Sequence, residues 1–341
     1  MGCDLNHTIP YGNGGPARAS NLKCSCRCHR VLKTSYVGPR RLGRTAARRH
    51  GIFVISVVRQ PRKFDRLWRR YDCAVAAKGP GHDSGSVRYL RSGSGEVLLL
   101  IHGNGMSRTA WHPVLPLLET QRDVIAVDLP GHGESAPIAP HLAPAPPGFA
   151  RVLSSLLDDL EIDRVHAAGN SLGGWTALEL AKLGRARSVC ALGPAGLWNR
   201  GPIGPMIPLA SSYLSARKWP GLVGRALQVR PIRSLLLHHA FGDPERIPIA
   251  DAERIVADLA AAQGFLATLL ATHMGRFTGG RSLGVPVTIA FGQRDRVVPK
   301  HARRSDEVPE HTRWLELPGL GHVPMWDNPA LVAHAILEAS T

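Results

Sequence analysis

The sequence predicts an α/β protein whose mostly parallel sheet is covered by helices on both faces. From residue 84 onward, short apolar runs alternate with segments of helical periodicity. Several runs are continuously apolar, as a strand buried on both faces requires. Most of them end at a glycine-rich or polar motif, and ligand sites in open α/β sheets lie at the carboxyl ends of the strands. The pattern therefore indicates an enzyme.

The elements can be assigned in order along this part of the chain. Strands are expected at residues 87–90, 96–101, 123–127, 165–168, 188–192, 285–291 and 313–317. Helices are expected at residues 148–160, 175–183 and 329–338. The last helix has Asp327 or Asn328 as its N-cap and Pro329 at its first position.

A long insertion separates two of these strands. Residues 193–284 carry helical patterns near 231–239 and 250–273 and hold no strand of comparable quality. A connection of this length is more typical of a lid than of a simple crossover. We therefore expect a helical insertion in a domain that spans residues 84–341.

Composition limits the class of protein. A chain of 341 residues with 44% hydrophobic and 20% charged residues can bury a large core without disulfides, and it is neither a membrane bundle nor collagenous. The charge is uneven: residues 1–80 carry 17 Lys or Arg against 3 Asp or Glu, a net +14 of the chain's +16. Since residues 81–341 are close to neutral, we expect no specific nucleic-acid binding by the main domain.

Residues 1–83 are predicted to be a basic, disordered extension. The sequence leaves open whether this segment does nothing for the fold or anchors the chain loosely to an anionic membrane or nucleic acid. Its apolar run, residues 52–58, is too short to span a bilayer, and arginines rather than a cleavage site follow it. Together with a single cysteine, Cys190, after residue 80, this favours a cytoplasmic location.

A cysteine cluster lies within the same extension. Cys24, Cys26 and Cys28 alternate with other residues, and no second pair follows at the spacing of a zinc site. We therefore expect an unstructured cysteine-rich stretch and no bound metal.

A candidate nucleophile follows the strand at 165–168. Residues 169–173 read Gly-Asn-Ser-Leu-Gly and fit G-x-S-x-G, in which the serine occupies a tight strand-to-helix turn. Side chains at Gly169 and Gly173 would collide with the neighbouring strand and helix. The amino end of the next helix also favours negative charge near the Ser171 oxygen.

A serine hydroxyl needs a base, and the base needs an acid to orient it. For this kind of turn the expected chain order is Ser, acid, His. Asp295 follows the strand at 285–291 and His322 follows the strand at 313–317, so both fall on the same sheet edge as Ser171. His132 lies between two glycines and fits a loop-shaping position, and Asp128 precedes Ser171 in the chain.

Acyl transfer also needs two backbone N–H groups to bind the oxyanion. One is expected from Leu172, the residue after the nucleophile. The other is expected from the loop at residues 102–105, at Asn104 or alternatively at Gly105.

Residues 84–341 resemble the α/β-hydrolase fold superfamily. The resemblance rests on His102 to Gly105, the run from Asp128 to Ser135, Gly169 to Gly174, the Asp295 segment and the pair Gly321-His322, in the family's order. It implies Ser171 as nucleophile on a nucleophile elbow, His322 as base, Asp295 as orienting acid and residues 193–284 as a cap domain. It does not cover residues 1–83.

The resemblance also implies a choice of reactions. Members with an aspartate at the elbow are haloalkane dehalogenases or epoxide hydrolases, and Ser171 argues against both. Val323, Pro324 and Met325 after His322 look more like carboxylesterases and lipases than C–C bond hydrolases, which usually place a tryptophan there. We therefore expect a serine hydrolase of carboxylic esters with an apolar acyl substrate and no cofactor. A C–C hydrolase of ring-cleavage products is the alternative, followed by a non-catalytic binding protein of the same fold.

Overall fold

The computed structural model describes residues 72–73, 87–304 and 306–341. Eight strands form one sheet in the order β1-β2-β4-β3-β5-β6-β7-β8. The strands are β1 (Asp72–Cys73), β2 (Tyr89–Gly93), β3 (Val97–Ile101), β4 (Asp123–Val127), β5 (Val165–Asn170), β6 (Ala186–Leu192), β7 (Val287–Gly292) and β8 (Arg313–Leu317). Only the pairs β1–β2 and β2–β4 are antiparallel. The predicted α/β class with a mostly parallel sheet is confirmed.

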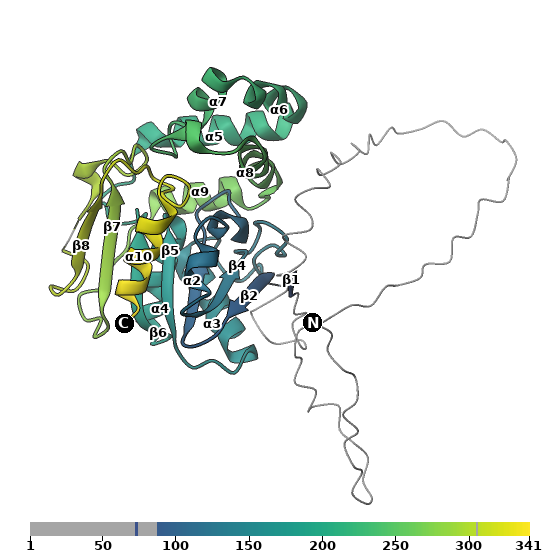
Figure 1. Cartoon of the computed structure of the whole chain (residues 1–341). Helices are drawn as coiled ribbons and strands as arrows, with labels where there is room; N and C mark the ends of the chain where they lie inside the picture. Colours follow the sequence, from purple (N-terminus) through teal and green to yellow (C-terminus); the bar gives the residue numbers. More distant parts are fainter. Residues whose placement is uncertain (1–71, 74–86, 305) are drawn as a thin grey trace, which may run out of the picture. The chain divides into compact units, whose positions relative to one another are not determined.

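Helices cover both faces of this sheet (Figure 1). Alternate residues of β3 explain why its sequence is apolar throughout: Leu99 and Ile101 pack into one core, and Leu98 and Leu100 into the other. The first core includes α3 (Pro146–Asp159) and α4 (Leu172–Lys182). The second includes α2 (Leu115–Leu118), preceded by the short helix η2 (Arg108–Trp111), and α10 (Pro329–Ala339).

The order of the strands determines which loops meet. Strand β3 lies between β4 and β5, with Ile101 in register with Val127 on one side and Gly169 on the other. The loops that follow β3 and β5 therefore leave the sheet side by side. Strands β7 and β8 pair with each other beyond β6, so their loops share the same carboxyl edge.

The N-cap of α10 is Asn328, whose Oδ1 accepts the N–H of Leu331 at 3.0 Å. Asp327, the other N-cap candidate from the sequence, does not cap α10. Its buried carboxylate accepts the N–H groups of Gly242 at 2.9 Å and Gly321 at 2.7 Å. It thus joins the segment before His322 to the long insertion.

Residues 193–284, here called the helical insertion, connect β6 to β7. The insertion contains α5 (Ile203–Lys218), α6 (Pro220–Gln228), α7 (Arg230–Leu237), the short η3 (Pro244–Arg246), α8 (Ile249–Ala261) and α9 (Phe265–Met274). The helical pattern expected near 250–273 is divided between two helices, α8 and α9, that meet at 81° with a break at residues 262–264. In the described residues no single helix is long and apolar enough to span a bilayer, although α8 and α9 together reach that length and composition.

Gly173 gives a direct test of the packing between α4 and β3. A Cβ at this position would lie 2.0 Å from the carbonyl oxygen of Ile101, a backbone atom that cannot move aside without shifting the strand. We expect Gly173→Ala to destabilise the protein by at least about 2 kcal/mol. In a domain of this size that lowers Tm by about 5 °C or more.

Gly224→Ala is the matched control for this measurement. Gly224 lies within α6 with open space around its Cβ position. Since alanine favours helix more than glycine, Tm should stay unchanged or rise slightly. Equal melting temperatures for the Gly173 and Gly224 variants would contradict the close approach of α4 to β3.

Candidate active site

Ser171 sits on a sharp turn between β5 and α4. Its backbone has a positive φ, with φ 55° and ψ −114°, a conformation that residues other than glycine rarely adopt. The flanking glycines make the turn possible, because a Cβ on Gly169 would lie 2.1 Å from the carbonyl oxygen of Gly173. The turn therefore projects the Ser171 side chain from the carboxyl edge of the sheet at the amino end of α4.

His322 and Asp295 are hydrogen-bonded to each other, as the sequence order predicted for a base and its orienting acid. His322 Nδ1 lies 2.9 Å from Asp295 Oδ2, and both side chains are buried. The other carboxylate oxygen, Oδ1, accepts the N–H groups of Val297 and Val298, each at 2.9 Å. Three donors thus fix the carboxylate, and the Nε2 atom of His322 is turned away from it.

The surroundings of Asp295 favour its charged form. Burial by itself would raise the pKa of this carboxyl group, but the charge interaction and hydrogen bond with His322 and the two backbone N–H groups outweigh it. The pKa of Asp295 is therefore below its ordinary value. An ionised Asp295 can hold the Nδ1–H tautomer of His322.

This lowered pKa predicts how Asp295→Asn changes stability with pH. A carboxyl whose pKa is depressed by folding contributes stability that is present above the ordinary aspartate pKa of about 3.9 and is lost as the pH falls through the folded value. The difference in unfolding free energy between wild type and Asp295→Asn should therefore be full at pH 5 and shrink below about pH 4. Urea unfolding at pH 5, 4 and 3 measures it, and a difference that widens with acid would contradict the assignment.

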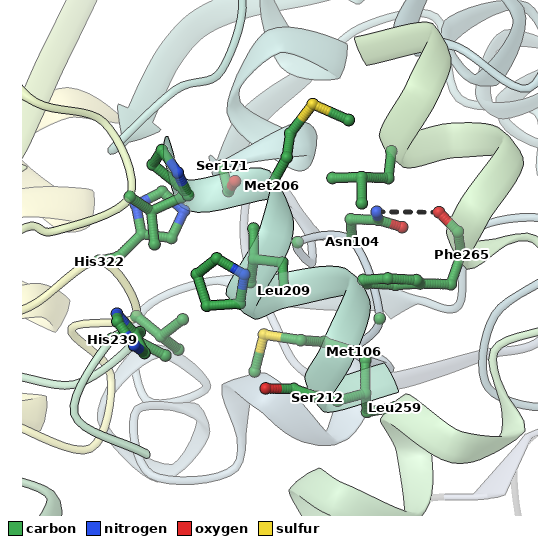
Figure 2. Close-up of a pocket in the computed structure, with 18 of the residues that line it drawn as sticks. Asn104, Met106, Ser171, Met206, Leu209, Ser212, His239, Leu259, Phe265 and His322 are labelled. Carbon is green, nitrogen blue, oxygen red and sulfur yellow. Dashed lines mark hydrogen bonds between the residues drawn. The ribbon is translucent and has the colours of Figure 1, made fainter. Parts of the chain in front are cut away.

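Ser171 and His322 line one cavity of about 340 Å³, and Figure 2 shows them on the same side of it. Among the hydrogen bonds of the described residues, none joins the Ser171 hydroxyl to His322. Bonds of this kind often tighten only when substrate is bound. Asp295 stands behind His322, so the three side chains follow the order serine, imidazole and carboxylate from the cavity inward.

The loop after β3 lies beside this cavity, together with the first residue of α4. Asn104, Gly105 and Leu172 all line it. Leu172 is the first residue of α4, so its N–H has no acceptor within the helix. Gly105 has φ +76°, and a Cβ there would meet Leu259 and Phe265 of the helical insertion at 2.6 and 2.9 Å.

Hydrogen bonds tie the same loop to the helical insertion. Asn104 Nδ2 donates to the carbonyl oxygen of Phe265 at the start of α9, at 3.2 Å (Figure 2). The hydroxyls of Ser107 and Thr109 donate to the partly buried carboxylate of Asp258 on α8, at 2.6 and 2.8 Å. The position of the loop therefore depends on α8 and α9, which motif spacing gave no means to predict.

Two other histidines near the site, His102 and His132, are buried and hydrogen-bonded within their loops. His102 is fully buried between the carbonyl oxygen of Gly103 and the N–H of Leu129, and burial lowers its pKa to about 4. His132 contacts Pro130 and the Asn104 side chain, and burial lowers its pKa to about 3. Both side chains thus bond to the loops that surround them. For His132 this agrees with the loop-shaping position expected from its two flanking glycines.

Asn170 is a residue that the motif analysis passed over. Its fully buried Nδ2 donates to the carbonyl oxygens of Leu192 at 3.0 Å and His322 at 2.8 Å. It therefore joins the turn that carries Ser171 to the loop that carries the His322 imidazole. Its position directly before the serine of the motif was the feature of the sequence that could have identified it.

Comparison with known proteins decides the family. The profile described as "Alpha/beta hydrolase family" matches residues 98–335, which is more than half of the chain. The chain belongs to this alpha/beta hydrolase family. This alpha/beta hydrolase is 31% identical to epoxide hydrolase EphH of Mycobacterium tuberculosis over 195 residues, 53% of this chain and 87% of that protein.

Other relatives act on other bonds. This alpha/beta hydrolase is 28% identical to the pimeloyl-[acyl-carrier protein] methyl ester esterase of Aeromonas hydrophila, covering 72% of this chain and 95% of that protein. It is 27% identical to a 2-hydroxy-6-oxononadienedioate/2-hydroxy-6-oxononatrienedioate hydrolase of Cupriavidus pinatubonensis, covering 60% and 72%. Its fold is similar to carboxylesterase CesB of Bacillus subtilis, with a TM-score of 0.61 and 20% identity over 81% of this chain and 95% of that one.

In the part of this alpha/beta hydrolase that the structure describes, no three His, Cys, Asp or Glu side chains are grouped so that they could hold a metal ion. The predictions for Cys24, Cys26 and Cys28 and for the basic extension concern residues outside the described ones, apart from the backbone of residues 72–73.

Proposed function

We propose that this alpha/beta hydrolase cleaves carboxylic esters through an acyl-enzyme intermediate on Ser171. The observation that carries the proposal is the hydrogen bond between His322 Nδ1 and Asp295, with His322 and Ser171 lining one cavity. A serine on a strained turn, an imidazole and an ionised carboxylate in this order are the parts that nucleophilic acyl transfer requires.

In the proposed first step, the Ser171 oxygen attacks the ester carbonyl while His322 Nε2 takes its proton. Asp295 keeps the imidazole in the Nδ1–H tautomer and stabilises the imidazolium. The N–H groups of Leu172 and Asn104 bind the oxyanion, with Gly105 as the alternative second donor. His322 then protonates the departing alcohol.

In the second step, water replaces the alcohol and attacks the acyl-enzyme. His322 removes a proton from that water and returns it to Ser171 as the acid leaves. The proposed cycle uses only side chains, backbone N–H groups and water, so it needs no metal or organic cofactor.

The cavity wall supports an apolar acyl group as the substrate portion. Met206 and Leu209 from α5 and Phe265 from α9 face it together with Ser171 (Figure 2). Because apolar contact area provides most of the binding free energy for an acyl chain, activity should increase with chain length until the cavity is filled. The esterase relative supports the bond type without naming the substrate of this chain.

The C–C hydrolase relative favours a second candidate on the same residues. The two reactions share the relay and differ in the bond that breaks. An epoxide hydrolase that attacks through an elbow carboxylate is not compatible with Ser171 in that position.

Fluorophosphonate labelling and a substrate panel test the proposal. The label should attach to Ser171, as located by peptide mass spectrometry, and block turnover of p-nitrophenyl esters of rising acyl length. Hydrolysis of a ring-cleavage dienoate with poor ester turnover would favour the second candidate. A folded protein that neither reacts with the label nor turns over any of these substrates would refute both and favour a binding role.

A further inference from the structure

Helix α5 carries apolar side chains both toward the cavity and toward solvent. Met206 and Leu209 face the cavity (Figure 2). Ile203, Ile207 and Leu214 recur at helical spacing on a second, solvent-facing strip, and their exposed fractions are 68%, 69% and 52%. Contact with the cavity accounts for Met206 and Leu209. Ile203, Ile207 and Leu214 are exposed to solvent in the described protein.

Two further large apolar side chains are exposed just after them in the chain. Trp219, 51% exposed, follows α5 directly, and Leu222, 66% exposed, lies in the first turn of α6. We call Ile203, Ile207, Leu214, Trp219 and Leu222 the outer apolar face. Isolated exposed leucines are ordinary in soluble proteins, but five large apolar residues within twenty positions mark an interaction surface.

The charge of this segment is one-sided. The sequence holds no Asp or Glu between Glu179 and Asp243, while Arg200, Arg217, Lys218 and Arg225 are exposed on or beside α5 and α6. The Lys218 ammonium lies 5.0 Å from the centre of the Trp219 ring. A tryptophan beside a lysine is the pairing that membrane-surface helices place at the boundary between headgroups and acyl chains.

We propose that the outer apolar face docks on an anionic lipid bilayer, with the apolar side chains among the acyl chains and the basic ones at the headgroups. A second copy of this face would bring like charges together. The extension at residues 1–80, with a net charge of +14, would be repelled in the same way. An anionic bilayer satisfies both the apolar and the basic side chains.

This docking would place α5 as the wall between the bilayer and the cavity of Ser171. The inference concerns the surface alone, and it holds whether or not the ester is the bond that breaks.

Lipid-quenching measurements on the full-length chain test the proposal. Vesicles of phosphatidylglycerol and phosphatidylcholine with brominated acyl chains should quench tryptophan fluorescence, and Trp219→Phe should remove that part of the quenching. This readout separates docking of α5 and α6 from any binding by the basic extension, which would hold the protein on the vesicle without bringing Trp219 into it.

Two paired variants decide the outcome. Ile203→Asp with Ile207→Asp should reduce the Trp219-dependent quenching about tenfold or more, because each change removes an inserted side chain and adds a charge that anionic lipid repels. Leu117→Asp with Leu183→Asp is the control, since these exposed leucines lie on α2 and directly after α4, outside the outer apolar face. The control pair should behave as wild type.

Both pairs should melt as wild type and keep the same turnover of a short soluble substrate. Equal quenching in the two pairs, or vesicle binding with no Trp219-dependent quenching, would overturn the proposal. So would equal quenching by purely zwitterionic vesicles. A wild-type dimer in sedimentation velocity that Ile203→Asp with Ile207→Asp dissociates, without quenching, would assign the face to a second copy instead.

Discussion

Ser171→Ala is expected to lower kcat for ester hydrolysis by about a million-fold while the protein stays folded. The hydroxyl is the atom proposed to form the acyl bond, and no other hydroxyl lies on the turn between β5 and α4. The remaining rate would come from the oxyanion donors and from binding. Burst and steady-state kinetics with a p-nitrophenyl ester measure the loss.

Ser154→Ala is the control for this variant, because Ser154 lies on α3 and does not line the cavity. It should leave kcat unchanged. Because alanine does not carry the Ser171 hydroxyl, Ser171→Ala should also fail to react with a fluorophosphonate. Substantial turnover by a folded Ser171→Ala protein would remove this residue from the mechanism.

His322→Ala is expected to lower kcat by a similar factor, because serine without its base is a poor nucleophile. The sharper test is the double variant. Since Ser171 and His322 would act as one unit, changing both should cost little more than changing either one. His334→Ala, on the exposed side of α10, provides the control and should keep wild-type kcat.

Two losses that multiply in the double variant would mean that Ser171 and His322 act independently. The hydrogen-bonded pair of His322 and Asp295 would then be a structural contact only. If His334→Ala lowered kcat as much as His322→Ala does, the loss of kcat would not be specific to His322.

The strands were predictable because their apolar runs are short, continuous and bounded by turn residues. The expected strands at 123–127 and 313–317 match β4 and β8, and the strand expected at 87–90 begins two residues later as β2. The meeting of His322 with Asp295 was predictable too, since both follow parallel strands that end at one edge of the sheet. The prediction used the order of the two residues along the chain and their positions directly after strands.

The helical insertion was harder to predict, and local sequence explains why. Helices α5 and α6 were not expected, because Pro205, Pro208 and Gly204 are poor helix formers and the apolar residues of α5 face two directions. Helices α8 and α9 look continuous in periodicity, yet they bend at residues 262–264. Tertiary packing of these helices against the sheet domain outweighs intrinsic propensity here.

The contacts of Asn104, Asp258 and Asn170 could not be inferred from spacing. Asn104 and Phe265 are 161 positions apart, and nothing local indicates that an amide of one loop will meet a carbonyl of α9. The same holds for Ser107 and Asp258, which are 151 positions apart. Such pairings depend on where the insertion packs.

These contacts limit how substrate preference can be transferred between relatives. Grafting residues 193–284 of this chain onto another member's sheet would leave Asp258 and the carbonyl of Phe265 without the donors that Ser107, Thr109 and Asn104 supply. The recipient loop would then be held by partners that do not match it. Engineered chimaeras should therefore exchange the segment 102–111 together with the insertion, as one inherited module.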